Sequence, residues 1–135
     1  MRPKESPPTM SPYVIPGIRR GVFSHQDVIH IACRHLSIDS GSIFGKSRKR
    51  ELVNARQVCM YFMRKFFPEM SLASVGEVFK KDHATVLHSI RVVKDQMFSS
   101  PAYKMSIEEL MAAMIKSVDE RKQELNSQKE NEIYK

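Results

Sequence analysis

The chain has 135 residues, of which 41% are hydrophobic, and it carries a formal net charge of +7 with a pI near 9.6. This length suits one domain with terminal extensions, and the positive charge favours a polyanionic partner such as nucleic acid. No apolar run reaches the roughly 18 residues of a membrane span, the N-terminus lacks the apolar segment of a signal peptide, and the 2 cysteines form no zinc-binding motif.

Residues 1–21 are predicted to form a disordered, extended arm. Five prolines lie in this segment, and proline fixes φ and lacks the N–H that a helix needs. The segment also has little apolar surface to bury. It ends near Arg19 and Arg20, which could follow a DNA backbone, with a plain solvated linker as the alternative.

The first helix is predicted to begin after Ser24, with Asp27 at the position of a capping-box acid. Its apolar face is expected to comprise five residues at helical spacing: Val28, Ile31, Ala32, His35 and Leu36. Residues 39–47 contain two glycines and three serines, which indicates a loop. A second helix is expected over residues 48–67, because an apolar face runs through this segment and Pro68 ends it.

A third, short helix is predicted from a cap at Ser71 to Phe79. Gly76 lies in its middle and costs about 1 kcal/mol relative to alanine, which a close helix crossing would justify. A fourth helix is expected from about residue 82 to 97, with a buried stripe formed by Val86, Leu87, Ile90, Val93 and Met97. The segment 98–101 is expected to break it.

A last amphipathic helix is predicted to start near Ser106, a good N-cap that is followed by acidic residues. Residues 123–135 are polar and are expected to form a frayed tail. No segment has the alternating pattern of a strand. The fold class is therefore all-α, a bundle of about five to six helices, with one domain over residues 22–122.

The third helix, the Lys80-Lys81 turn and the fourth helix have the proportions of a helix-turn-helix motif. In that motif the second helix enters the major groove with its N-terminus first. Asp82 is expected to accept a hydrogen bond from cytosine N4, and Ala84 to pack on a thymine methyl group. Four further residues are expected to contact phosphates or bases: Lys80, Lys81, Thr85 and His88.

Structural alternatives exist for these residues. Asp82 opens a helix and would serve equally as a simple N-cap. His83 and His88 would be ordinary surface or half-buried histidines, and as metal ligands they lack the spacing and a third partner. No metal site is expected.

A second basic feature lies at the junction of the predicted loop and the second helix. It comprises Lys46, Arg48, Lys49 and Arg50, with Arg56 following two turns later. A helix N-terminus attracts anions, and arginines on a loop beside a helix-turn-helix can enter a narrow A·T-rich minor groove. A solvated charged face is the alternative.

Three segments together resemble the C-terminal DNA-binding domain of the bacterial replication initiator DnaA, which belongs to the Trp-repressor-like helix-turn-helix class. They are Lys49-Arg50-Glu51-Leu52-Val53-Asn54-Ala55-Arg56-Gln57-Val58-Cys59-Met60-Tyr61, Ser71-Leu72-x-x-Val75-Gly76-x-x-Phe79, and Asp82-His83-Ala84-Thr85-Val86-Leu87-His88. The resemblance covers roughly residues 22–122.

The resemblance implies a role for each matching residue. Major-groove readout would fall on Asp82, His83 and Ala84, and Arg48 best matches the arginine that enters the minor groove. Backbone contacts would fall on six residues: Arg56, Ser71, Leu72, Lys81, Thr85 and His88. The implied target is an A·T-rich nine-base-pair element, the DnaA box, and the implied role is control of replication initiation or of transcription.

The chain departs from the family in two ways. Ala84 stands where the family usually has threonine or serine, and its side chain cannot form a hydrogen bond, so specificity at that base is expected to change. The chain also lacks an ATPase module: Gly45-Lys46-Ser47 has neither the upstream glycine nor the strand of a phosphate-binding loop. We therefore expect no ATP binding and no cofactor, and the start at Met1 favours a separately encoded protein over a fragment.

The main alternative function is a helical protein–protein interaction module that uses helix 105–125, in which Met105, Met111 and Met114 would form an adaptable contact surface. Core filling is the ordinary role of such methionines. Nothing in the sequence assembles a nucleophile, a base and an orienting group, so no enzyme activity is expected. We expect a monomer in the bacterial cytoplasm, associated with the nucleoid.

Overall fold

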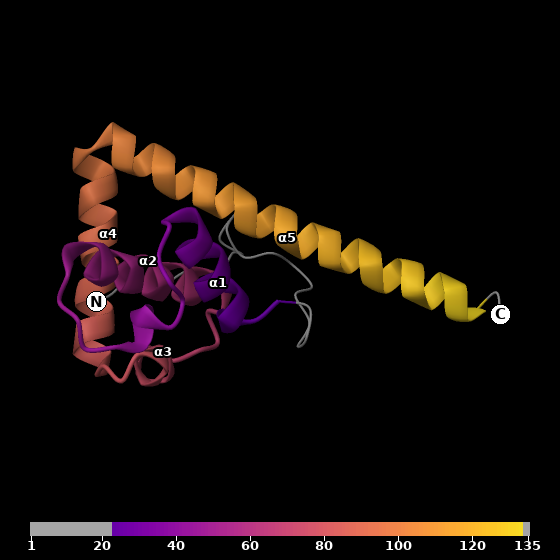
Figure 1. Cartoon of the computed structure of the whole chain (residues 1–135), viewed down its shortest axis with the longest axis horizontal. Helices are drawn as coiled ribbons and strands as arrows, with labels where there is room; N and C mark the ends of the chain where they lie inside the picture. Colours follow the sequence, from indigo (N-terminus) through magenta and orange to yellow (C-terminus); the bar gives the residue numbers. More distant parts are fainter. Residues whose placement is uncertain (1–22, 134–135) are drawn as a thin grey trace, which may run out of the picture.

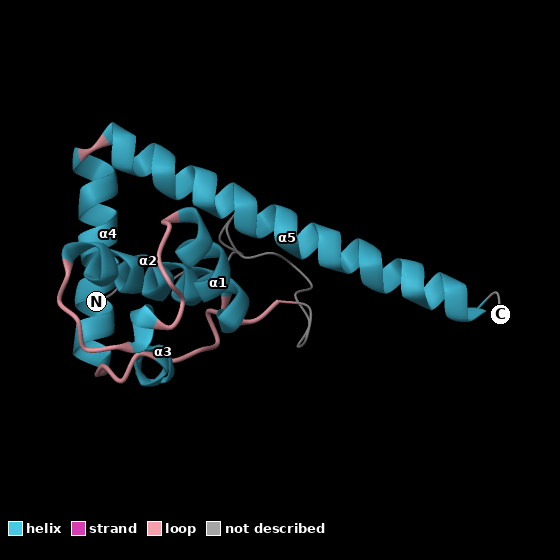
Figure 2. Ribbon diagram, in the orientation of Figure 1, coloured by secondary structure: helices cyan, strands magenta, loops and turns pink. Residues whose placement is uncertain are grey.

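The computed structural model describes residues 23–133, and side chains through residue 128. Within this range all regular secondary structure is helical, and loops connect the helices (Figures 1 and 2). The elements are α1 His25–His35, the 3₁₀ helix η1 Ser42–Phe44, α2 Arg50–Phe66, α3 Leu72–Val78, α4 His83–Ser99 and α5 Pro101–Ile133. The predicted all-α fold class is confirmed. The predicted Pro-rich arm, residues 1–21, lies outside the described residues.

Helix α1 begins as predicted. The Ser24 backbone N–H donates to Asp27 Oδ2 at 2.8 Å, so the acid at the third helical position satisfies the N–H of the cap residue. The apolar face is only partly as predicted, because His35 is exposed and Ile29 and Cys33 are buried. Helix α1 is covered by both α2 and α5, so its buried arc is shifted toward these two neighbours.

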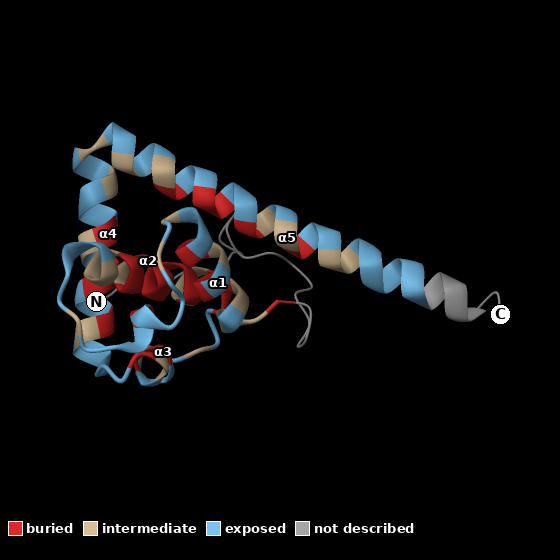
Figure 3. Ribbon diagram, in the orientation of Figure 1, coloured by how far each residue is buried: buried red, intermediate tan, exposed pale blue. Residues whose placement is uncertain are grey.

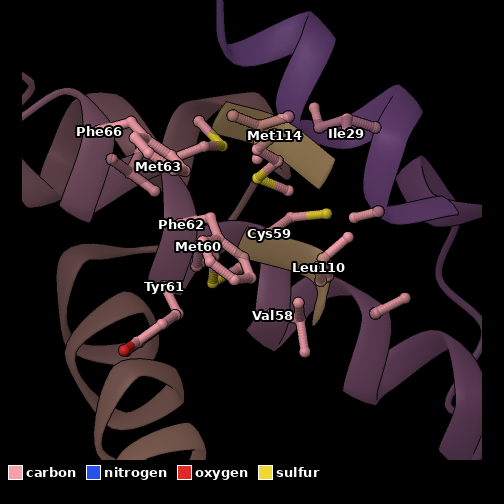
Figure 4. Packing of buried hydrophobic residues seen from close by; sticks show 14 of the residues in the cluster. Ile29, Val58, Cys59, Met60, Tyr61, Phe62, Met63, Phe66, Leu110 and Met114 are labelled. Atoms are coloured by element: carbon pink, nitrogen blue, oxygen red, sulfur yellow. The ribbon is translucent and has the colours of Figure 1, made fainter. Parts of the chain in front are cut away.

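Helix α2 is the central element and contacts α1, α3 and α4. Its buried side chains come from nearly all around the helix, as Figure 4 shows for Val58, Cys59, Met60, Tyr61, Phe62, Met63 and Phe66. A helix that is covered on several sides needs this broad apolar surface. The core is completed by Ile29 of α1 and by Leu110 and Met114 of α5.

The corner between α4 and α5 differs from the prediction. Segment 98–101 does interrupt the helix, but only at Ser100, and α5 starts at once with Pro101. Ser100 Oγ accepts a hydrogen bond from the Tyr103 N–H at 3.2 Å. Proline is well suited to the first helical position because its missing N–H has no intrahelical partner there. The predicted start near Ser106 is therefore wrong by about one and a half turns.

Helix α5 packs on the body through its first half and then extends away from it (Figure 3). Met111 and Met114 are buried, at 8% and 0% exposure, whereas Met105 is 62% exposed. The methionine surface proposed for partner binding is thus largely core. The predicted frayed tail also differs, since α5 continues through residues 123–133, a stretch without glycine or proline and rich in the helix formers Lys, Gln and Glu.

The two cysteines are buried, and neither forms a disulfide. Burial raises the pKa of both thiols, most strongly at Cys59, so the reactive thiolate is disfavoured. Both therefore serve as small apolar core residues. Among residues 23–133, no helix combines the length and apolar character needed to cross a membrane.

One ion pair joins the two ends of the domain. Arg121 of α5 donates to Asp27 Oδ1 of α1 at 2.6 Å. Partial burial by itself would raise the pKa of Asp27, but the hydrogen bonds from Arg121 and Ser24 outweigh it and hold this pKa below its ordinary value. The ion pair fixes α5 against α1 beyond Val118, the last buried residue among those that the structure describes.

We expect Asp27→Asn to lower the free energy of unfolding by roughly 0.5–1 kcal/mol at neutral pH, because a partly exposed ion pair contributes little more. The asparagine can still accept the Ser24 N–H. Since the folded pKa of Asp27 is lowered, its contribution is complete above the unfolded pKa of about 3.9 and is lost as the pH falls through the folded value. Urea unfolding of both proteins should show a constant difference from pH 7 to 5 that shrinks below pH 4. An unchanged difference at pH 3 would contradict this assignment.

Candidate nucleic-acid interface

Helix α3 and helix α4 are joined by a four-residue turn, residues 79–82, with tight backbone geometry. Ser71 caps α3 by accepting the Ser74 N–H on Oγ at 3.0 Å, as predicted. At the other end the Lys81 N–H donates to the Gly76 carbonyl at 2.8 Å, and Lys80 has a φ of 57°, in the left-handed region. These contacts set the angle at which α4 leaves the turn.

Gly76 is required by this turn. A Cβ at this position would overlap the Lys81 carbonyl oxygen and would also lie within 3.2 Å of Val86 Cγ2 on α4. The close approach that the sequence suggests for Gly76 is therefore present, and its main partner is the backbone of the turn rather than a crossing helix.

Helix α4 presents its first turn to solvent. Its buried side, Val86, Ile90 and Val93, holds it against the core, while Asp82, His83 and Ala84 are exposed. Asp82 is the N-cap: its Oδ1 accepts the Thr85 N–H at 2.8 Å. Hydrogen bonds from Thr85 hold the pKa of Asp82 below its usual range, so the carboxylate is ionised and fixed in orientation.

The structure corrects one residue of the predicted stripe on α4. Leu87 is 38% exposed rather than buried, because it faces away from Val86 and the core. It lies one turn after His83, and the exposed Arg91 follows one turn later. Both belong to the exposed face of α4, and spacing by four from His83 is the signal that could have identified them in the sequence.

The second basic feature, residues 46–50, comprises the end of the loop between η1 and α2 and the first residue of α2, and we call it the basic loop. Its four cationic side chains, Lys46, Arg48, Lys49 and Arg50, are all exposed. The loop borders a cavity of about 430 Å³ whose opposite wall belongs to the α3–α4 turn and α4. Residues of the predicted site that line this cavity are Lys46, Arg48, Arg56, Lys80, Lys81, Thr85 and His88.

The cavity therefore brings together two sets of predicted residues that are distant in the sequence, Lys46, Arg48 and Arg56 in one and Lys80, Lys81, Thr85 and His88 in the other. Lys49 and Arg50 are exposed at the start of α2, and Arg50 lines a neighbouring hollow together with Arg48. Ser71 and Leu72, at the start of α3, do not line the cavity, and Leu72 is half-buried. The DNA contacts of all these residues stay predictions.

Arg56 is the clear exception among the predicted contacts. It is only 6% exposed, and its guanidinium donates to three carbonyls of the preceding loop. The bonds run from Nε to Ile43, from Nη1 to Ser47 and from Nη2 to Gly45, at 2.7, 2.6 and 2.8 Å. Each guanidinium nitrogen thus donates to a backbone carbonyl, Arg56 also lines the cavity, and its predicted phosphate contact stays a prediction.

Two stacked aromatic rings connect the loop region to the helix-turn-helix, and no sequence pattern predicts this contact. Phe44 of η1 stacks on Phe79 of the turn, with ring centroids 5.9 Å apart and planes inclined by 18°. Phe44 remains 45% exposed at the cavity rim. An aromatic residue beside a loop glycine is a weak signal, because nothing local shows which ring it will meet.

The sequence predicts neither a metal site nor a phosphate-binding loop. Among the side chains that the structure describes, residues 23–128, no three of His, Cys, Asp or Glu are grouped in a way that could hold a metal ion. Gly45-Lys46-Ser47 follows a 3₁₀ helix and precedes α2, rather than lying between a strand and a helix as a phosphate-binding loop does.

Comparison with known proteins gives one family. The family described as bacterial dnaA protein helix-turn-helix matches residues 25–93, which includes the basic loop, the α3–α4 turn and the first turns of α4. The chain is similar to two chromosomal replication initiator proteins DnaA. It is 35% identical over 91 residues to the protein from Bacteroides thetaiotaomicron and 40% identical over 85 residues to the protein from Bacteroides fragilis.

These alignments cover most of this chain but little of the relatives. The two Bacteroides alignments span 67% and 62% of this chain and only 19% and 18% of the relatives. The DnaA of Desulfotalea psychrophila is 47% identical over 51 residues, or 38% of this chain and 10% of that protein. The chain thus spans about one-fifth of the length of the Bacteroides relatives.

Proposed function

The chain belongs to the bacterial DnaA helix-turn-helix family, and from this premise we propose that it binds a specific duplex DNA sequence without catalysing a reaction. In this proposal the first turn of α4 enters the major groove, and Arg48 of the basic loop enters the adjacent minor groove. The target is an A·T-rich site similar to a DnaA box, and the process served is control of replication initiation or of transcription.

One observation carries the proposal: the basic loop and the start of α4 border the same cavity and expose their polar side chains beside it. Major-groove reading needs exposed side chains on the first turn of a helix, which the polar Asp82 and His83 and the small Ala84 supply. A narrow minor groove attracts arginine, and Arg48 is the exposed arginine that lines this cavity.

The charges around the cavity support DNA over an uncharged partner. Besides Arg48, five exposed cations surround or adjoin it, namely Lys46, Lys49, Arg50, Lys80 and Lys81. Asp82 is the one acid of the turn, and its carboxylate is already engaged with Thr85. Phosphates would neutralise these cations and release counterions, which makes binding depend strongly on salt.

The primary test is a binding selection on random-sequence duplexes with the full chain. We expect enrichment of one short A·T-rich motif, since base contacts from α4 and from Arg48 impose different sequence requirements. Recovery of duplexes with no shared motif would refute specific recognition. Chromosomal DNA as target would place the protein at the nucleoid, with one monomer per site as the expected stoichiometry.

Salt dependence provides a second expected result. With about five phosphate contacts, a plot of log affinity against log salt concentration should have a slope of about −4 to −5. Replacing both Lys80 and Lys81 by alanine should reduce the magnitude of this slope by about 2, measured by fluorescence anisotropy from 50 to 300 mM salt.

The matched control replaces Lys104 and Lys116 of α5 by alanine, because these exposed lysines lie outside the cavity and the basic loop. The control should keep the wild-type slope. Equal changes of slope in the two double variants would show that net charge, rather than this surface, controls binding.

A further inference from the structure

The basic loop is held by one buried guanidinium. The three carbonyls that Arg56 binds belong to Ile43, Gly45 and Ser47, alternate residues that end immediately before Arg48. Ile43 is fully buried and fixes the beginning of this segment in the core. Arg56 therefore determines the path of the backbone up to the residue that carries the minor-groove side chain.

Only arginine can make this set of contacts. The guanidinium offers donors in a rigid planar fork, whereas lysine presents one compact ammonium group. Among the described residues no carboxylate forms an ion pair with Arg56, so carbonyl dipoles compensate its buried charge. Each of the three guanidinium nitrogens of Arg56 therefore has one backbone carbonyl as its partner.

A second contact ties the same segment to the DNA-reading helices. Phe44 lies between Ile43 and Gly45, and its ring stacks on Phe79 in the α3–α4 turn. The segment before Arg48 is thus bound on one side to α2 through Arg56 and on the other to the turn through Phe44. The position of Arg48 relative to the first turn of α4 follows from these two contacts.

We propose that Arg56 is a positioning residue: by clamping residues 43–47 it sets the distance between Arg48 in the minor groove and α4 in the major groove, and it makes no DNA contact itself. This inference rests on the proposed function, because it explains how Arg48 is positioned when the protein is bound to DNA. It predicts that Arg56 affects minor-groove recognition only through Arg48.

The test uses the duplex recovered from the random selection and a second duplex in which 2,6-diaminopurine replaces adenine in the A·T-rich flank. Diaminopurine adds an amino group to the minor-groove edge and leaves the major-groove acceptor and donor of adenine in place. The wild type should bind the modified duplex roughly tenfold more weakly, in line with the loss of one base contact. Arg48→Ala should not distinguish the two duplexes.

Arg56→Lys is expected to behave like Arg48→Ala, with weaker binding to the unmodified duplex and no discrimination against diaminopurine. Combined with Arg48→Ala, it should cause no further loss, because the side chain that it positions is already absent. Arg56→Gln serves as a second variant that places no ammonium group in the buried site. All affinities are measured below the unfolding temperature of each variant.

Arg64→Lys is the matched control. Arg64 lies on the same helix, and its Nη1 donates to the carbonyls of Pro68 and Met70, so it clamps the next loop in a similar way. This variant should lose stability but keep the full tenfold discrimination. Retained discrimination in Arg56→Lys, or an added loss of affinity in the Arg48→Ala background, would overturn the proposal and indicate a direct phosphate contact by Arg56.

Hydrogen exchange of the free protein separates this proposal from the proposed function. The Gly45 and Lys49 amides are hydrogen-bonded to Ser42 and Ser47 within the clamped segment, and they should exchange at least several-fold faster in Arg56→Lys than in Arg64→Lys. Equal exchange would refute the clamp even if DNA binds. A wild-type protein that binds no duplex would refute the proposed function and the role of Arg48, whatever the exchange rates.

Discussion

Gly76→Ala is expected to disrupt the α3–α4 turn and to reduce DNA affinity by at least tenfold. The added methyl group would overlap the Lys81 carbonyl oxygen, which is backbone and is fixed by its position in the turn. Overpacking of this kind costs roughly 1–3 kcal/mol and occasionally more. The gain of about 1 kcal/mol in helix propensity opposes it only in part.

The effect should appear in both stability and binding. A net loss of 1–2 kcal/mol lowers Tm by roughly 4–16 °C in a domain of about 100 residues. Binding falls further because relief of the overlap moves Lys81, and the start of α4 moves with it. Calorimetry measures the first quantity and anisotropy titration at a temperature where the variant is folded measures the second.

Gly41→Ala is the control for this prediction. A Cβ at Gly41 would meet only the Oδ2 atom of Asp39, at 3.2 Å, on a flexible and exposed side chain. Gly41 also has an ordinary right-handed φ of −68°, so alanine is tolerated there. A Gly76→Ala protein with wild-type Tm and affinity would show that the turn is looser than this geometry.

His83→Ala is expected to remove most of the sequence preference while leaving the electrostatic part of binding intact. His83 is exposed on the first turn of α4, and its side chain makes no contact that supports the core. Loss of one base contact costs roughly 1–3 kcal/mol, or about 5- to 150-fold in affinity for the selected site. Affinity for an unrelated duplex and the slope against salt should not change, because phosphate contacts determine both.

The measurement compares affinities for the selected and the unrelated duplex at one salt concentration. His30→Ala is the control, since His30 is exposed on α1, outside the cavity that the basic loop and α4 border, and should keep the full ratio. A His83→Ala protein that loses affinity equally for both duplexes would place His83 on a phosphate. A His83→Ala protein that keeps its full affinity for the selected duplex would leave major-groove reading to Asp82, Ala84 and Leu87.

Local patterns in the sequence were sufficient to predict the helix-turn-helix. Ser71 and Asp82 are capping residues whose hydrogen bonds reach only three residues ahead, and both bonds are present. The helical spacing of Val86, Ile90 and Val93 placed the buried side of α4 and, by difference, its exposed first turn. The family also followed from these motifs, because their spacings lie within contiguous segments.

Two predictions about the ends of helix α5 differ from the structure. Segment 98–101 breaks the helix as predicted, but α5 starts with Pro101 rather than near Ser106, because proline suits the first helical position. The polar residues 123–135 are predicted to fray, but residues 123–133 are helical beyond the ion pair of Arg121 with Asp27, which agrees with their intrinsic helix propensity.

The helix-turn-helix, its capping residues and the family can be predicted from the sequence, because caps and helical periodicity depend on neighbours within one or two turns. Three features follow only from tertiary contacts: the Arg56 guanidinium binds three backbone carbonyls, Phe44 stacks on Phe79, and the basic loop faces α4 across one cavity. Arginine next to a cationic cluster has the same sequence pattern whether it binds phosphate or carbonyl oxygens. In this protein the arginine lies beside carbonyl oxygens because Ile43 is buried and the loop passes over α2. Both features depend on contacts between residues that are distant in the chain.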